Sequence, residues 1–81
     1  MSHLDLTVGD DRFERLYRNE YEPMVALAYL LVGVQQAAED VVQDAFAAIS
    51  ARFDEVENPV AYLRTSVVNG TRRWHRRLRR E

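Results

Sequence analysis

The chain contains no cysteine and no lysine, and its 81 residues include only 3 glycines and 2 prolines. Without cysteine it has neither a disulfide framework nor a Cys-type metal site, so its stability depends on helix packing, which suits a reducing cytoplasm. The longest apolar run, Met24 to Val34, is too short to span a bilayer. The first residues lack the basic start and the apolar stretch of a signal peptide. We therefore expect a soluble, cytoplasmic protein that is not inserted in a membrane.

The charged residues are unevenly distributed along the chain. Residues 1–60 hold 4 Arg against 12 acids, a net charge of −8, whereas residues 61–81 hold 7 Arg against 1 acid, a net charge of +6. This asymmetry indicates two partners of opposite charge, the basic half being suited to phosphates. Arginine makes bidentate and stacked contacts that lysine cannot make, although genomic base composition explains the exclusive use of arginine more simply.

The first predicted helix follows a turn. Gly9-Asp10-Asp11 is typical of a turn that ends in a helix N-cap, so we expect residues 1–10 to be a flexible segment and residues 11–81 to form one folded domain. The helix is expected to kink or divide at Pro23, which removes a backbone donor, and to end at Gly33. Its apolar stripe consists of Phe13, Leu16, Tyr17, Tyr21, Met24, Leu27, Ala28 and Leu31.

Two further helices are predicted, and no strand pattern is present. One covers Ala37 to Phe53, with an apolar face of Ala38, Val41, Val42, Ala45, Phe46, Ile49 and Phe53. The other begins at Pro59, because Asn58 is a good N-cap and proline suits the first helical position, and ends near Arg80. Its core stripe consists of Leu63, Val67, Gly70 or Thr71, Trp74 and Leu78. At about 1.5 Å per residue this helix is roughly 30 Å long, so its last turns are expected to project beyond a small core.

The polar face of the second predicted helix carries Glu39, Asp40, Gln43 and Asp44. On the pattern alone, a solvated helix face is the simplest interpretation. Paired carboxylates also serve in acid–base catalysis and in metal sites, but no nucleophile, cleft signature or His ligand accompanies these residues. The sequence therefore predicts no enzyme, no metal site and no cofactor.

The arginines from Arg72 to Arg80 have two interpretations. They are a solvated helix end that the helix dipole favours, or they follow the phosphates of a nucleic acid. We favour the nucleic acid, because several arginines over three turns can track a backbone. His75 among them is expected to face solvent, and Trp74 to be part of the core.

Two segments carry a resemblance to a known family. Ala38-Glu39-Asp40-Val41-Val42-Gln43-Asp44-Ala45-Phe46 resembles the A-E-D-h-x-Q-[DE]-x-F signature of bacterial extracytoplasmic-function (ECF) sigma factors, where h is apolar. Pro59-Val60-Ala61-Tyr62-Leu63, followed by Asn69, resembles the family's P-x-x-W-L-x-x-x-x-x-N. The resemblance extends from about Phe13 to Arg80.

The chain departs from the family's pattern at three positions. Tyr62 stands where the family usually has tryptophan and keeps an aromatic ring, so its stacking role is expected to survive. Val34 replaces a common aspartate and leaves the second predicted helix without a good N-cap. Arg73 replaces a frequent aspartate and adds positive charge.

This resemblance implies an all-α, compact three- to four-helix domain of the sigma-factor region 2 type, which binds core RNA polymerase and recognises and melts the minus-ten promoter element. The second helix would dock on the clamp helices of the polymerase's largest subunit through Glu39, Asp40, Gln43, Asp44 and Ala47. The following loop and the third helix would hold a flipped base of the nontemplate strand. The implied DNA-binding residues are Phe53, Asn58, Tyr62, Arg64, Ser66, Asn69, Arg72, Arg73, Arg76 and Arg77.

Other interpretations stay open. Tyr62 lies at the margin of the core stripe, so it either stacks on a base or packs in the core. The chain is alternatively a helical interaction module held by an anti-sigma factor, with little DNA binding by the isolated domain, or a generic arginine-rich nucleic-acid binder. The helix-turn-helix domain into which the family continues is not expected within these 81 residues.

Overall fold

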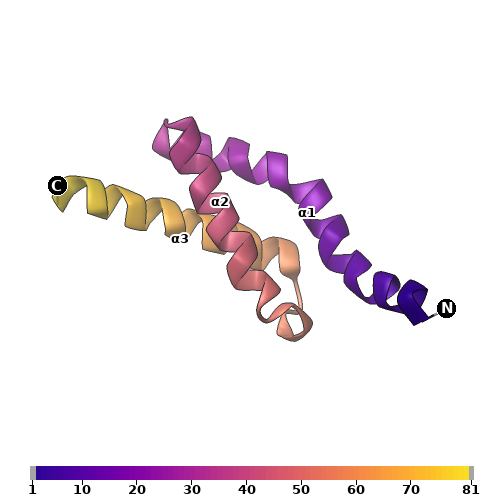
Figure 1. The fold of residues 1–81 in the computed structure, drawn as a ribbon. Coiled ribbons are helices and arrows are strands. Elements are labelled where there is room, and N and C mark those ends of the chain that lie inside the picture. Colours follow the sequence, from indigo (N-terminus) through magenta and orange to yellow (C-terminus); the bar gives the residue numbers. More distant parts are fainter. Residues whose placement is uncertain (1, 81) are drawn as a thin grey trace.

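The computed structural model describes the backbone of residues 2–80 and the side chains of residues 11–80. It contains three α-helices and one short 3-10 helix, in the order α1 (Ser2–Val32), α2 (Gln35–Ser50), η1 (Phe53–Glu55) and α3 (Pro59–Arg80). Helices α1 and α2 run in opposite directions, α2 crosses α3, and each of the three contacts the other two (Figure 1). The prediction of an all-α domain is confirmed, with no strand in the part of the chain that is described.

Helix α1 is longer and less interrupted than the sequence predicted. Its backbone is helical from Ser2, so the prediction of a turn and N-cap around Asp11 was wrong. A glycine inside a helix costs only about 1 kcal/mol relative to alanine, which does not suffice to end it at Gly9. The flexibility of residues 1–10 stays a prediction.

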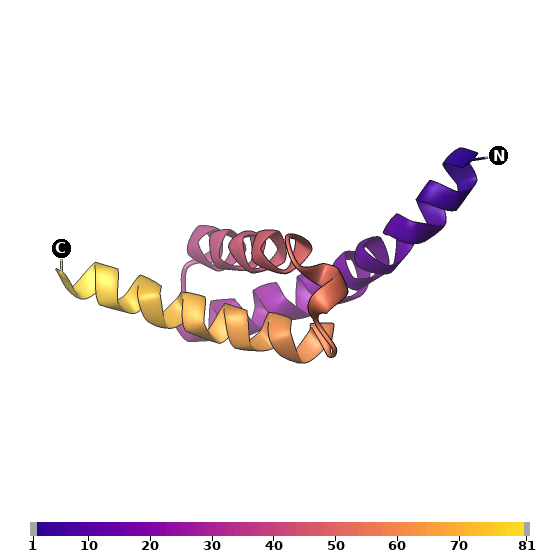
Figure 2. The same cartoon turned by 90° about the horizontal axis from the view of Figure 1, so that it is seen from below.

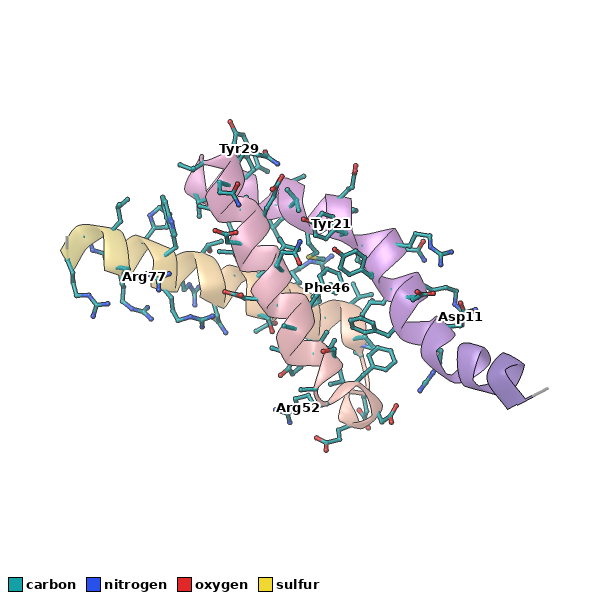
Figure 3. All side chains as sticks on the ribbon, viewed as in Figure 1. Asp11, Tyr21, Tyr29, Phe46, Arg52 and Arg77 are labelled. Carbon is teal, nitrogen blue, oxygen red and sulfur yellow. The ribbon has the colours of Figure 1, made fainter. Side chains whose placement is uncertain are left out.

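Pro23 lies inside α1 and does not divide it. The helix changes direction in its middle, near Tyr21 (Figures 2 and 3). A bend there agrees with the expected kink, because the proline ring pushes against the carbonyl of the residue four positions earlier. The proline therefore bends α1 and leaves it continuous.

Gly33 ends α1, as predicted. Its φ of 74° lies in the left-handed region, which glycine adopts without strain, and its N–H donates to the carbonyl of Tyr29 at 2.7 Å. Nε2 of His75 lies 2.7 Å from the carbonyl oxygen of Leu31 and donates to it. This carbonyl is one of the last four of α1, which lack partners within the helix. His75 is exposed, as predicted, and it also bonds to α1, a contact that the sequence did not indicate.

Helix α2 begins two residues earlier and ends three residues earlier than predicted. Val34 is its N-cap and makes no side-chain capping bond, which agrees with the weak cap expected there. Its predicted apolar residues from Ala38 to Ile49 are buried, and Phe53 packs half-buried in η1. The core consists of Met24, Ala28, Val32, Ala37, Ala38, Val41, Val42, Ala45, Phe46, Ile49, Leu63 and Val67.

Three residues of the predicted stripes are exposed. Tyr17, Leu31 and Leu78 are 37%, 42% and 54% exposed. Leu78 lies on the last turns of α3, which project beyond the other helices (Figures 1 and 2). Its helical phase is that of a core residue, but no neighbouring helix extends far enough to cover it. The expected projection of α3 is thus also the reason that the predicted stripe fails there.

An aromatic cluster joins α1 to α2 around Phe46, which is 3% exposed. The centroid of its ring lies 6.2 Å from that of Phe13, 4.7 Å from that of Tyr17 and 6.2 Å from that of Tyr21. Phe13 also meets Phe53 edge-on at 5.6 Å. The cluster fixes the N-terminal half of α1 and the start of the η1 loop to the core.

Helices α2 and α3 pack closely at Gly70. A Cβ atom at this position would lie 2.8 Å from Cγ1 of Val41, closer than such atoms approach in proteins. The absence of a side chain at Gly70 therefore lets the two helices pack at this distance.

Candidate functional site

The polar face of α2 is largely accessible. Asp40, Gln43, Asp44 and Ala47 are exposed and Glu39 is half-buried. Two carboxylates of this face accept hydrogen bonds from glutamines in the first turn of the helix. Nε2 of Gln35 donates to Glu39 at 2.8 Å, and Nε2 of Gln36 donates to Asp40 at 3.0 Å.

The next turn of the same face is arranged differently. Nε2 of Gln43 reaches the hydroxyl of Tyr21 on α1 at 3.4 Å. Asp44 forms no salt bridge with any residue from 11 to 80. Among the predicted docking residues, Asp44 thus offers the carboxylate that is most available to a partner's cation.

The start of α3 is capped as predicted. Oδ1 of Asn58 accepts the N–H of Ala61 at 3.2 Å, and the carbonyl of Asn58 accepts the N–H of Tyr62 at 3.0 Å. Both oxygens of Asn58 are therefore engaged in starting the helix. Its side-chain NH₂ group is the part that remains for a ligand.

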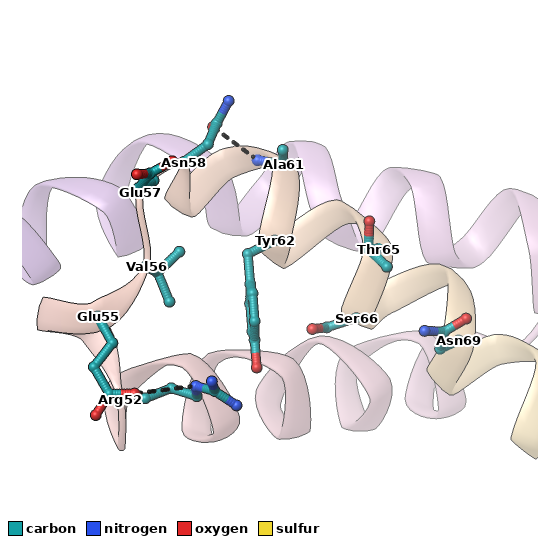
Figure 4. Close-up of a pocket in the computed structure, with 10 residues that line it drawn as sticks. All are labelled: Arg52, Glu55, Val56, Glu57, Asn58, Ala61, Tyr62, Thr65, Ser66 and Asn69. Atoms are coloured by element: carbon teal, nitrogen blue, oxygen red, sulfur yellow. Dashed lines mark hydrogen bonds and ion pairs between the residues drawn. The ribbon is translucent and has the colours of Figure 1, made fainter.

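A groove of about 690 Å³ lies between the loop that contains η1 and the first turns of α3 (Figure 4). This volume falls within the range of small-ligand sites, about 300–1,000 Å³. The structure brings four predicted DNA-binding residues together along it: Asn58, Tyr62, Ser66 and Asn69. The groove is lined by Arg52, Glu55, Val56, Glu57, Asn58, Ala61, Tyr62, Thr65, Ser66 and Asn69. Tyr62 is half-buried, which agrees with its predicted place at the margin of the core.

Arg52 is a lining residue that the sequence did not indicate. Its Cζ atom lies 5.7 Å from the centroid of the Tyr62 ring, and its Nε lies 3.7 Å from Oε1 of Glu55. Arg52 is ten positions from Tyr62 and outside the basic cluster, so only the fold of the η1 loop brings the two together. No local sequence signal marks this contact.

Two predicted DNA-binding residues lie apart from the groove. The Phe53 ring packs on Phe13, and Cζ of Arg12 lies 5.3 Å from its centroid, so the ring faces α1. Arg64 is exposed and follows Tyr62 by two positions, a rotation of about 200° around the helix axis, which places it on the opposite side of α3.

The exposed arginines of α3 continue the line of the groove. Arg73 and Arg76 lie on the same side of the helix as Tyr62 and Asn69, because successive steps of three or four residues connect these positions. Arg72 and Arg77 are exposed beside them. Helical phase therefore aligns the basic residues with the groove, along one side of α3.

A small hollow of about 200 Å³ separates this side of α3 from the polar face of α2. Asp44 contributes to it from α2, and Ser66, Asn69 and Arg73 contribute from α3. The residues predicted to bind polymerase and those predicted to bind DNA thus meet at one border.

None of the helices described within residues 2–80 combines the length and the apolar character that are needed to cross a membrane.

Comparison with known proteins gives one assignment. No curated protein and no solved structure matches the chain significantly. Residues 16–81 match the family Sigma-70 region 2, a stretch that includes α2, η1, α3 and α1 from Leu16 onward. Region 2 is a transcription-initiation domain through which sigma factors bind core RNA polymerase and promoter DNA. Because the match covers most of its length, the chain belongs to the sigma-70 region 2 family.

Proposed function

We propose that the chain is the region 2 domain of a bacterial ECF sigma factor that acts in the cytoplasm. Helix α2 docks on the clamp helices of the polymerase's largest subunit, and the groove beside Tyr62 holds an unpaired base of the nontemplate strand of the minus-ten element. The observation that carries the proposal is the groove itself, which gathers an aromatic ring and polar side chains at one end of a line of exposed arginines.

The charge of α2 supports the docking surface. Its exposed carboxylates complement a basic coiled coil, and such complementarity steers the encounter and fixes the register of the two surfaces more than it adds affinity. Gln35 and Gln36 hold two of these carboxylates in place before a partner arrives. Asp44, which lacks an ion pair among the described side chains, would meet a cation directly.

The charges around the groove support the path of the DNA strand. The loop carries three carboxylates, those of Asp54, Glu55 and Glu57, which repel phosphates. The arginines of α3 attract phosphates. The sugar–phosphate backbone is therefore expected to follow α3 while an uncharged base enters the groove, where stacking on an aromatic ring supplies about 1–3 kcal/mol.

Replacing Asp44 with arginine is expected to weaken binding to core RNA polymerase at least tenfold, or about 1.4 kcal/mol, because it places like charges together at the interface. Co-purification with core polymerase measures the effect. Glu57→Arg makes the same charge change away from α2 and should bind normally. Equal binding by Asp44→Arg and the unmodified chain would show that the docking face is wrongly assigned.

Replacing both Arg72 and Arg76 with alanine is expected to weaken single-stranded DNA binding and to flatten its salt dependence. Each phosphate contact contributes about 0.7 to the log–log slope for single strands, so the slope should fall by about 1.4. Titrations of a labelled oligonucleotide at several salt concentrations measure it. Arg18→Ala on α1 is the control and should leave the slope unchanged. An unchanged slope in the double variant contradicts the DNA role of α3.

A second candidate is a helical interaction module that an anti-sigma factor holds. The observation that favours it is the exposure of Tyr29, Leu30, Leu31 and Val34 around the end of α1, since clustered apolar side chains on a surface mark protein contacts. The same titrations separate the two candidates. A chain that has no affinity for single-stranded DNA at low salt favours the interaction module.

A further inference from the structure

The two faces of the Tyr62 ring differ in their surroundings. Figure 4 shows the ring standing across the groove, with Arg52 and Val56 on one side and Ser66 and Asn69 on the other. The guanidinium of Arg52 lies over the ring, with Cζ 5.7 Å from the centroid. A cation at this distance is attracted to the face of an aromatic ring. The loop side of Tyr62 is therefore already occupied by a side chain of the protein.

Arg52 also has an acidic neighbour in the loop. Its Nε lies 3.7 Å from the carboxylate of Glu55, three residues later in η1. The loop thus supplies both the cation over the ring and a carboxylate beside that cation. The short chain of contacts from Glu55 to Arg52 to Tyr62 connects the loop to the first turns of α3.

The opposite side of the ring is open. Among residues 11–80, Arg52 contributes the one cation over Tyr62, and no other aromatic ring packs on it. Ser66 is small and Asn69 is exposed, so the groove continues on this side. A flat, uncharged group can approach the ring there without displacing another side chain from its face.

We propose that Arg52 is a positioning residue of the DNA site: it covers the loop side of Tyr62 and holds the ring, so that an unpaired base stacks on the side of Ser66 and Asn69. This inference rests on the proposed function. A ring already held in its binding orientation loses less conformational freedom when the base arrives, which favours binding. Arg52 acts through Tyr62 and does not neutralise a phosphate, because Glu55 and its acidic neighbours repel phosphates from that side.

The test compares Arg52→Ala with a phosphate-contact control, Arg76→Ala, in the full 81-residue chain. The probes are short single-stranded oligonucleotides, each with the fluorescent base 2-aminopurine at one position, whose emission falls when it stacks. Arg52→Ala is expected to bind about two- to fivefold more weakly, the equivalent of an exposed cation–π contact, with less quenching and an unchanged salt slope. Arg76→Ala should lower the slope by about 0.7 and keep the quenching.

A double-mutant comparison isolates the pathway through the ring. Tyr62→Ala is expected to bind about 5- to 150-fold more weakly, and adding Arg52→Ala to it should have little further effect, since the two residues act as one unit. A salt slope that falls in Arg52→Ala, together with additive losses in the double variant, would show that Arg52 contacts phosphate and would overturn the proposal. If the unmodified chain binds none of the probes at low salt, the DNA part of the proposed function fails and this inference fails with it.

Discussion

Replacing Phe46 with alanine is expected to lower the free energy of unfolding by about 3–5 kcal/mol, the usual cost of deleting a buried aromatic ring. Phe46 is 3% exposed and its ring meets those of Phe13, Tyr17 and Tyr21. Small domains have about 5–15 kcal/mol of stability in total, so this loss is a large fraction of the whole. Urea unfolding followed by far-UV circular dichroism measures it.

Phe53→Ala is the matched control for that experiment. It deletes the same side chain from η1, where the ring is only half-buried against Phe13. Its effect should be clearly smaller, because less apolar surface returns to water. Equal losses in the two variants would contradict the central place of Phe46 in the aromatic cluster.

Replacing Gly70 with leucine is expected to lower the free energy of unfolding by about 3 kcal/mol, the upper end of the usual cost of overpacking a core. Even the first atom of the new side chain would lie 2.8 Å from Cγ1 of Val41, and the branched valine has little rotamer freedom with which to move away. Asn69→Leu introduces the same residue at the exposed neighbouring position and should change the stability little.

A further check on the Gly70 contact is that a side chain at residue 70 should become stabilising once Val41 is shortened. In a Val41→Ala background the nearest remaining side-chain carbon of residue 41, Cβ, is 3.8 Å from the position of the new Cβ, an ordinary contact distance. Gly70→Ala should then stabilise the chain by up to about 1 kcal/mol through its better helix propensity. If Gly70→Leu is as stable as Asn69→Leu, the contact with Val41 does not prevent a larger side chain at residue 70.

Features that depend on local chemistry were predictable from the sequence. The three helices followed from apolar spacing, and the ends at Gly33 and Asn58 followed from backbone conformation and capping. Predictions failed where an end or a surface depends on distant parts of the chain. Leu78 has the helical phase of a core residue, but it is exposed because the last turns of α3 project beyond the other helices (Figure 1). His75 bonds to a carbonyl that is 44 residues away in the sequence.

The residues of the candidate site also include some that local sequence predicts and some that only the fold brings together. Tyr62, Ser66 and Asn69 share one side of α3 because of helical periodicity, so they could be grouped before the structure was known. Arg52 could not be assigned, since its contact with Tyr62 depends on the path of the η1 loop. Phe53 lies on the side of the loop that faces α1, because the aromatic cluster draws its ring toward Phe13.

The close packing at Gly70 also affects how the surfaces of α2 and α3 are positioned relative to each other. Helix α2 carries the proposed polymerase surface and α3 carries the proposed DNA surface, and the contact between Val41 and Gly70 sets the distance between them. A side chain at residue 70 that pushed the helices apart would shift one surface relative to the other, even in a domain that still folded. The lack of a side chain at Gly70 would thus keep the proposed DNA surface at a fixed position relative to the proposed polymerase surface.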